Sequence, residues 1–385
     1  MRIAYVTETY PPELNGVALT VERTVTYLRG AGHEVELVRP RQPHEPALCA
    51  DDEWRTFGVP IPMYRDLRFG VTWTRSLRQR WLRRRPQLVH VATPGPLGWA
   101  AVRAARALGI PATSDFRTNF HQYSHYYGFG WCEPMVSAYL RRLHNATDRT
   151  FVPTHSVRRD LAARRFERLA VVGRGVDTER FSPRHRSPAL RAEWGVDERT
   201  PVVLHVGRLA AEKNVHLALC AWEAMREQCP AARMVVVGDG PMRRRWEQEF
   251  PAARFVGAQR GEALARHYAS ADVFLFPSLS DTFGNVVLEA MASGLAVLAY
   301  DTGAAGEHIE DCESGLLVRP GDEAAYIAAA CSLVDQWADL EEMRRAARAT
   351  ALTLAWPSVL QRFESHLQDV AHAVEATDAR AAWSV

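Results

Sequence analysis

Short apolar runs alternate with stretches of helical periodicity along the whole chain. Such runs, bounded by polar loops, are typical of strands buried on both faces, and these strands form parallel sheets covered by helices. A first set predicts strands at residues 2–6, 35–38, 88–92, 111–115, 149–153 and 169–173. A second set predicts strands at residues 202–206, 233–238, 253–257, 273–277, 296–300 and 315–318. The pattern therefore predicts two successive doubly wound α/β domains.

The boundary between the two domains is expected in residues 181–201, a polar segment that holds three prolines. We accordingly expect a first domain over residues 1–183 and a second over residues 199–355. A chain of 385 residues is long enough for two such cores. Residues 357–374 have apolar positions at helical spacing and predict a C-terminal helix, for which the first domain is a candidate packing surface.

The composition indicates the cellular compartment of the protein and the kinds of partner that it can have. The formal net charge is only +2, but the 47 basic residues include a single lysine, Lys213. The cysteines have no spacing typical of a metal site, which predicts reduced, mostly buried thiols of a cytoplasmic protein. They are Cys49, Cys132, Cys220, Cys229, Cys312 and Cys331. No run approaches the ~18 apolar residues of a membrane span, and a signal peptide is not predicted.

Two loops that follow predicted strands are candidate phosphate sites. Gly16 lies in the loop after strand 2–6, where the N-terminus of the next helix offers free N–H groups, although an ordinary turn explains this pattern too. In the second domain, Gly207 and Arg208 follow strand 202–206, and Lys213 precedes the next helix. An arginine and a lysine five residues apart can converge on one pyrophosphate. The alternative is a solvated loop, but a chain that otherwise uses arginine favours a specific role for its lysine.

A second group of candidates lies in residues 276–294, where a buried strand, a polar loop and a helix over 285–293 are predicted, with Gly294 ending the helix. Asp281 in the loop and Glu289 in the helix could each accept hydrogen bonds from sugar hydroxyls. The rival interpretation is an N-capping aspartate and a solvent-facing glutamate. Upstream, Gly238 and Gly240 suit either close approach of a nucleotide or a plain tight turn.

These motifs together resemble the retaining glycosyltransferases of family 4. The resemblance rests on D-x7-E before AMASG, on GRL–EKN and GDGP upstream, and on NGV, GRGVDTERFSP and ASADVFLFPS elsewhere, so that it covers most of the chain. The family pattern is usually E-x7-E, and Asp281 replaces its first glutamate. Within the family the chain looks most similar to bacterial GDP-mannose-dependent α-mannosyltransferases and to lipid-directed sulfoquinovosyl- or glucosyltransferases.

The resemblance implies a GT-B fold, with two Rossmann-like domains facing across a cleft. It implies retaining transfer of a mannose- or glucose-type hexose from a GDP- or UDP-sugar, without a metal, to a hydroxyl of a lipid or glycan. Arg208, Lys213 and Asp281 would act on the diphosphate and the transferred sugar. The other implied donor-site positions are Gly16, Gly207, Val256, Gly257, Phe283, Gly284, Asn285, Val286 and Glu289. A GT-B sugar-nucleotide epimerase and a non-catalytic sugar-nucleotide-binding protein are the alternatives.

One departure from the family concerns the first domain. The family often has a histidine near the sugar, in an HT motif after the fourth strand, where this chain has Arg117 before Thr118. Arg117, His121 or Asp115 could take its place. The aromatic segment 118–131 is a candidate acceptor site or, alternatively, a surface loop.

Residues 75–85 carry six arginines and no acidic residue. On a helix, Leu77, Trp81 and Leu82 could cover the core while the arginines face solvent. The sharper interpretation is a basic face on anionic lipid, with Trp73 and Trp81 at the interface. This would place the protein in the cytoplasm, peripherally on the inner face of the membrane. Nucleic acid is not an expected partner, because no known binding module accompanies the charge.

Overall fold

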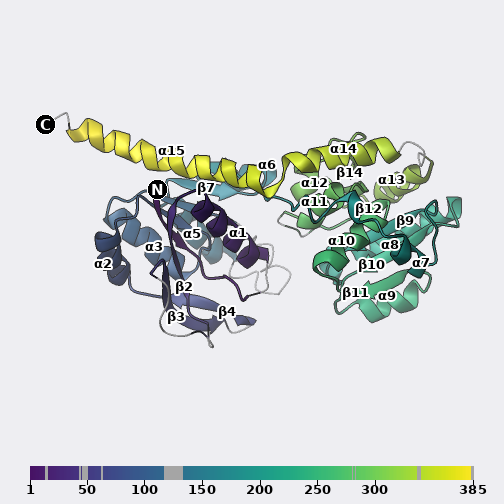
Figure 1. Ribbon diagram of the computed structural model, residues 1–385, viewed down its shortest axis with the longest axis horizontal. Coiled ribbons are helices and arrows are strands. Elements are labelled where there is room, and N and C mark those ends of the chain that lie inside the picture. The colour runs from purple at the N-terminus through teal and green to yellow at the C-terminus, as the bar shows by residue number, and fades with distance from the viewer. Residues whose placement is uncertain are drawn as a thin grey trace. The chain divides into compact units, whose positions relative to one another are not determined.

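The chain folds into two compact units, which are shown as ribbons in Figure 1. The computed structural model describes residues 1–13, 16–42, 45, 51–61, 64–116, 133–279, 281, 283–335 and 340–382. Unit 1 comprises Met1–Gly173 with Leu360–Val385, and unit 2 comprises Arg174–Val359. Each unit is built around its own sheet.

Unit 1 contains an eight-stranded sheet with the order β4-β3-β2-β1-β5-β6-β7-β8. Its strands are β1 Arg2–Val6, β2 Glu34–Pro40, β3 Glu53–Ile61, β4 Tyr64–Val71, β5 Leu88–Val91, β6 Ala112–Asp115, β7 Arg149–Val152 and β8 Leu169–Val171. Its helices include α1 Gly16–Gly30, α2 Thr74–Arg84, α3 Pro96–Ala107, α5 Glu133–His144 and α6 His155–Ala163. All the neighbouring strands are parallel except β3 and β4, an antiparallel pair that the sequence analysis did not predict.

The C-terminal helix α15, Trp356–Ala382, runs along unit 1 (Figure 1). Its Phe363, Leu367 and Val370 are buried in one cluster with residues of β1 and α1. The apolar spacing that predicted the helix is therefore the stripe that packs on the first sheet, and each such buried side chain contributes about 1.5–3 kcal/mol to folding.

Unit 2 contains a six-stranded parallel sheet with the order β11-β10-β9-β12-β13-β14. Its strands are β9 Val202–Val206, β10 Arg233–Val237, β11 Arg254–Gly257, β12 Val273–Phe276, β13 Ala296–Tyr300 and β14 Leu316–Val318. Its helices include α7 Pro188–Glu193, α8 Val215–Gln228, α9 Arg243–Glu249, α10 Gly261–Ser270, α11 Asn285–Ala292, α12 Gly303–His308, α13 Glu323–Asp335 and α14 Leu340–Thr353. The strand order reverses between β9 and β12, so a ligand site is expected at the carboxyl ends of these two strands.

The boundary between the units lies at Gly173/Arg174 and not within residues 181–201 as expected. Phe181 and Trp194 are buried in a core cluster of unit 2. Arg191 is also buried, and its guanidinium donates to Asp272 Oδ2 at 3.3 Å and to backbone carbonyls. A polar, proline-rich composition misled the prediction, because here the polar residues anchor the segment to unit 2.

Two smaller expectations were wrong. On α2, Leu77 and Trp81 are buried, but Leu82 is 57% exposed, because it lies about 100° around the helix from Trp81. Trp81 is thus a core residue and not an interface residue, whereas Trp73 is 82% exposed. None of the four cysteines in the described part of the chain is fully buried: Cys220, Cys229 and Cys331 are half-buried and Cys312 is exposed. Cys49 and Cys132 lie outside the described residues.

Within the described residues, no helix combines the length and the apolar character that a membrane crossing requires.

Candidate functional site

The single lysine takes part in an ion pair at the carboxyl ends of β9 and β12. Lys213 ends a short 3₁₀ turn, Ala211–Lys213, in the loop after β9, and Asp281 lies in the loop after β12. Lys213 Nζ is 2.9 Å from Asp281 Oδ1, and the two side chains are 17% and 26% exposed. Because water is largely excluded, this pair is screened less by salt than a surface pair. The switch point of the sheet, where the strand order reverses, therefore carries a half-buried ion pair.

Asp281 also has a partner on its other carboxylate oxygen, since Ser278 Oγ donates to Oδ2 at 2.6 Å. The N-cap of α11 is Gly284, which has a left-handed φ of 86° and no side chain with which to cap the helix. Asp281 is therefore not the N-capping residue that one interpretation of the sequence proposed. Ser278 and Lys213 instead fix the carboxylate in the loop, where its remaining lone pairs can accept hydrogen bonds from a ligand.

Arg208 lies at the start of the same loop but reaches further into solvent. Its side chain is 58% exposed, and Nη1 is 3.6 Å from Glu212 Oε1. The two cations thus differ: Lys213 is held in place, and Arg208 forms a long, exposed pair of the kind that contributes 0–1 kcal/mol. An exposed guanidinium can turn toward an anionic ligand at little cost.

The glycines of the GDGP motif let the loop after β10 pack against the loop of Arg208. A Cβ atom at Gly238 would lie 1.8 Å from the Gly207 carbonyl oxygen, and one at Gly240 would lie 2.3 Å from that of Leu209. Leu209 N–H donates to the Asp239 carbonyl at 2.9 Å, which ties the two loops together. The motif therefore supports the shape of the neighbouring loop, a role that the sequence analysis did not consider.

Gly257 has a φ of 74° and accepts a hydrogen bond from Gly238 N–H at 2.9 Å, so the end of β11 belongs to the same group of loops. The Val256 carbonyl accepts from Gln259 Nε2 at 3.0 Å. These two implied donor-site positions are thus joined to the Gly238 loop through the backbone.

Helix α11 brings further candidates to the carboxyl end of β12. Asn285 Oδ1 is buried and has no hydrogen-bond partner among the described residues. The Phe283 ring is 3% exposed and belongs to the core, and Val286 packs against that core. We therefore expect Phe283 to contact a sugar only through its backbone. Free N–H groups in the first turn of α11 are suited to an anion.

Glu289, one turn into α11, is not a solvent-facing residue. The Tyr268 hydroxyl donates to Glu289 Oε2 at 3.0 Å, and Tyr268 is fully buried. Burial, together with the nearby Glu289 carboxylate, raises the pKa of Tyr268 well above its usual value, so the hydroxyl keeps its proton and remains a donor. Glu289 is therefore held in position and still has acceptor capacity for hydroxyl groups.

The structure describes only some of the candidate site residues of unit 1. Gly16 is the first residue of α1. Asp115 ends β6, is almost fully buried, and its Oδ2 lies 3.2 Å from His90 Nε2. Arg117, His121 and the aromatic segment 118–131 lie outside the described residues.

His205 is a residue of this region that the sequence analysis missed. It lies in β9, two residues before Gly207, and is completely buried. Its Nδ1 lies 2.9 Å from the Leu275 carbonyl oxygen. The pKa of His205 is lowered to about 4, chiefly by burial and also by Lys213, while the hydrogen bond to Leu275 and the Asp281 carboxylate act in the opposite direction. The only signal in the sequence was a histidine inside an otherwise apolar strand, a pattern that also fits a purely structural residue.

Both units match known protein families. Residues 14–180 match the family described as Glycosyltransferase Family 4, and residues 200–336 match Glycosyl transferases group 1. The GDP-mannose-dependent alpha-mannosyltransferase of Mycolicibacterium smegmatis is 38% identical over 377 residues, which are 96% of this chain and 98% of that protein. The sulfoquinovosyl transferase SQD2 of Arabidopsis thaliana is 31% identical and covers 92% of this chain and 71% of that protein.

The fold is likewise shared with a solved structure. HepE from Anabaena in complex with UDP has a TM-score of 0.72 to this chain at 17% sequence identity, covering 96% of this chain and 100% of that one.

The packing of the GDGP glycines gives a stability prediction. Gly240→Ala places a Cβ atom against the Leu209 carbonyl, which is backbone and cannot move aside, so the free energy of unfolding should fall by about 1–3 kcal/mol. Urea denaturation, monitored by circular dichroism, measures this change in the free energy of unfolding. The matched control is Gly30→Ala, because a Cβ atom there meets nothing within 4 Å. Equal stability of Gly240→Ala and the wild type would contradict the packing role.

Proposed function

As a member of glycosyltransferase family 4, this chain is a hexosyltransferase of the GT-B fold that uses a nucleotide-sugar donor, and we propose that this donor is GDP-mannose. The proposal is supported by the mycobacterial relative, whose name specifies GDP-mannose and which matches nearly the whole chain. The mannose is transferred with retention to a hydroxyl of a lipid or glycan acceptor.

The observation that carries the placement of the nucleotide sugar is the ion pair of Lys213 and Asp281 at the switch point of unit 2. An ammonium group has three N–H donors, and Asp281 Oδ1 takes one of them. The others remain for phosphate oxygens. Since the carboxylate and the ammonium are in direct contact, one small region offers a cation for a diphosphate and an acceptor for a sugar hydroxyl.

The reaction breaks the bond between the anomeric carbon and the phosphate oxygen and forms one to the acceptor oxygen. Negative charge grows on the departing diphosphate as the sugar becomes oxocarbenium-like. In our proposal, Lys213, Arg208 and the free N–H groups of α11 stabilise this charge without a metal ion. The acceptor proton passes to the departing phosphate oxygen, so the mechanism requires no protein base.

The remaining donor-site residues hold the other parts of the nucleotide sugar. Asp281 accepts from a hydroxyl of the transferred hexose, and Glu289, held by Tyr268, accepts from the ribose hydroxyls. Gly284 and Asn285 bring backbone N–H groups near the phosphates, and the Val256–Gly257 backbone adjoins the base. The Gly207 N–H donates to the Val237 carbonyl at 3.0 Å, so this glycine lets the backbone lie close to the phosphates without donating to them. Gly16, the first residue of α1, is a further proposed donor-site residue.

The choice of base is tested by a thermal-shift comparison of GDP-mannose with UDP-glucose. A ligand at 100 times its Kd stabilises the folded state by about 2.7 kcal/mol, so GDP-mannose should raise the unfolding temperature by several degrees and UDP-glucose should not. Stabilisation by UDP-glucose alone would contradict the assignment of guanine and leave the enzyme class unchanged.

The role of the ammonium is tested by Lys213→Ala. The loss of one preorganised donor should lower kcat for transfer from GDP-mannose by about 100- to 1,000-fold while the circular dichroism spectrum is unchanged. Arg245→Ala is the control, because Arg245 is an exposed cation of the same unit with a 3.6 Å pair to Glu249. Near-normal turnover of Lys213→Ala would remove the residue from the mechanism.

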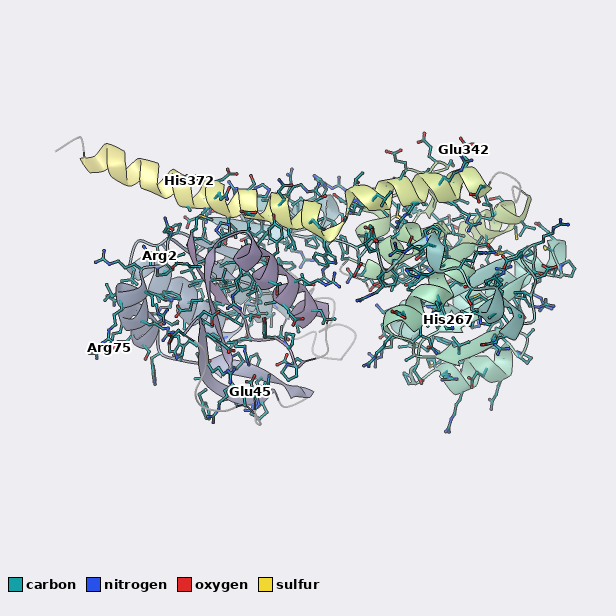
Figure 2. All side chains as sticks on the ribbon, in the orientation of Figure 1. Arg2, Glu45, Arg75, His267, Glu342 and His372 are labelled. Carbon is teal, nitrogen blue, oxygen red and sulfur yellow. The ribbon has the colours of Figure 1, made fainter. Side chains whose placement is uncertain are left out.

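We also propose that α2 contacts anionic lipid, as suits a transferase with a lipid acceptor. Arg75, which is labelled in Figure 2, and Arg78, Arg83 and Arg85 are exposed. Arg80 instead donates to Glu36 Oε1 at 2.6 Å and lies over the Trp54 ring, so it belongs to the fold. The exposed side chain of Trp73 precedes this basic segment, and that of Leu82 lies within it.

Vesicle sedimentation tests this contact. Replacing Arg75, Arg78 and Arg83 with glutamine removes about 1 kcal/mol per residue of attraction to phosphatidylglycerol vesicles, which predicts roughly a 100-fold weaker partition. The matched control replaces three exposed arginines of unit 2, Arg199, Arg245 and Arg266. If both triple variants bind like the wild type, α2 is not the contact.

A further inference from the structure

His205 occupies the place where the two central strands of unit 2 separate. The ladder between β9 and β12 pairs Val203 with Val273 and Leu204 with Phe274, and it extends no further. On the other side, β9 stays paired with β10 through Val206. One residue further along both strands, Nδ1 of His205 lies 2.9 Å from the Leu275 carbonyl oxygen. A side chain thus continues the hydrogen bonding of β9 to β12 at the opening of the switch point.

This contact fixes the tautomer of the ring. A carbonyl oxygen can only accept, so Nδ1 carries the hydrogen and donates it. Because the buried ring is neutral, Nε2 is left with a lone pair and can only accept. The geometry therefore assigns His205 as an acceptor toward the loop after β9, where Nε2 lies 3.4 Å from the position of a Cβ atom built on Gly207.

Nε2 has no hydrogen-bond partner among the described residues, although it is fully buried. A buried acceptor without a partner is costly, and each such group in a folded protein needs an explanation. A phosphate oxygen cannot supply the missing partner, because it too is an acceptor. The Lys213 ammonium, in the loop that begins at Gly207, has N–H donors beyond the one that Asp281 accepts, and its charge acts on His205.

We propose that His205 is a positioning residue for Lys213. When a diphosphate binds, the ammonium turns from Asp281 toward it, and Nε2 of His205 accepts one of its N–H groups. The ammonium is then held between a neutral acceptor and the diphosphate, and the Asp281 carboxylate is released for a sugar hydroxyl. Neutrality matters, because an imidazolium at this position would repel the lysine. The inference rests on the proposed function, since it assigns Lys213 to the donor diphosphate.

Two substitutions separate this role from a structural one. In His205→Asn, the amide nitrogen lies where Nδ1 was and keeps the bond to Leu275, but the acceptor at Nε2 is lost. In His205→Gln, the longer amide restores an acceptor near Nε2 and gives up the Leu275 bond. We expect kcat per folded molecule, measured with GDP-mannose, to fall about 10- to 100-fold in the asparagine variant. The glutamine variant should stay within about threefold of the wild type, and the donor KM should change less than kcat in both.

His267, which is labelled in Figure 2, supplies the matched control, because it is another buried histidine of unit 2. Its Nδ1 lies 2.8 Å from a backbone carbonyl oxygen, that of Ala263. His267→Asn should leave kcat unchanged. A double-mutant cycle adds a second readout: the effect of His205→Asn should disappear in the Lys213→Ala background, since coupled residues are not additive.

Three results would overturn the inference: an active asparagine variant, a glutamine variant as impaired as the asparagine variant, or effects that add fully in the Lys213→Ala background. A wild-type protein that transfers no sugar from any nucleotide donor would instead contradict the proposed function.

Discussion

The donor unit depends on an ammonium and a carboxylate held 2.9 Å apart at the carboxyl ends of its two central strands. Lys213 and Asp281 come from loops 68 residues apart, and the parallel sheet brings them together because its order reverses between β9 and β12. Ser278 fixes the carboxylate and the short 3₁₀ turn fixes the lysine backbone, so that only the end of the lysine side chain turns when a diphosphate binds. A charge arranged in advance stabilises a leaving group without reorganisation during the reaction.

The surrounding loops support this ion pair through the packing of their backbones and not through charged side chains. Gly238 and Gly240 allow the loop after β10 to lie directly on the backbone of residues 207–209, and a side chain at either position would push that loop away. His205 extends the hydrogen bonding of β9 where the ladder to β12 ends. Tyr268 holds Glu289 from the neighbouring helix. Buried neutral groups thus support the few charged groups of the site, which keeps unpaired charge out of the core.

The sequence was enough to predict the parallel strands, because strands buried on both faces leave continuous apolar runs. It singled out Lys213 as the single lysine and Asp281 by its place in the loop before a helix. It could not predict β3 and β4, since a hairpin at a sheet edge has exposed positions such as Phe57 and Val71 and no clean apolar run. The boundary at Gly173/Arg174 was hidden by a buried arginine in a polar segment. His205 was missed because its importance lies in the direction of one lone pair, which no spacing encodes.

The most direct measurement of the central claim is a crystal structure of the protein with GDP. We expect Lys213 Nζ to lie about 2.7–2.9 Å from an oxygen of the diphosphate, with Arg208 turned toward the same group. A diphosphate bound elsewhere, with Lys213 still paired only to Asp281, would contradict the account.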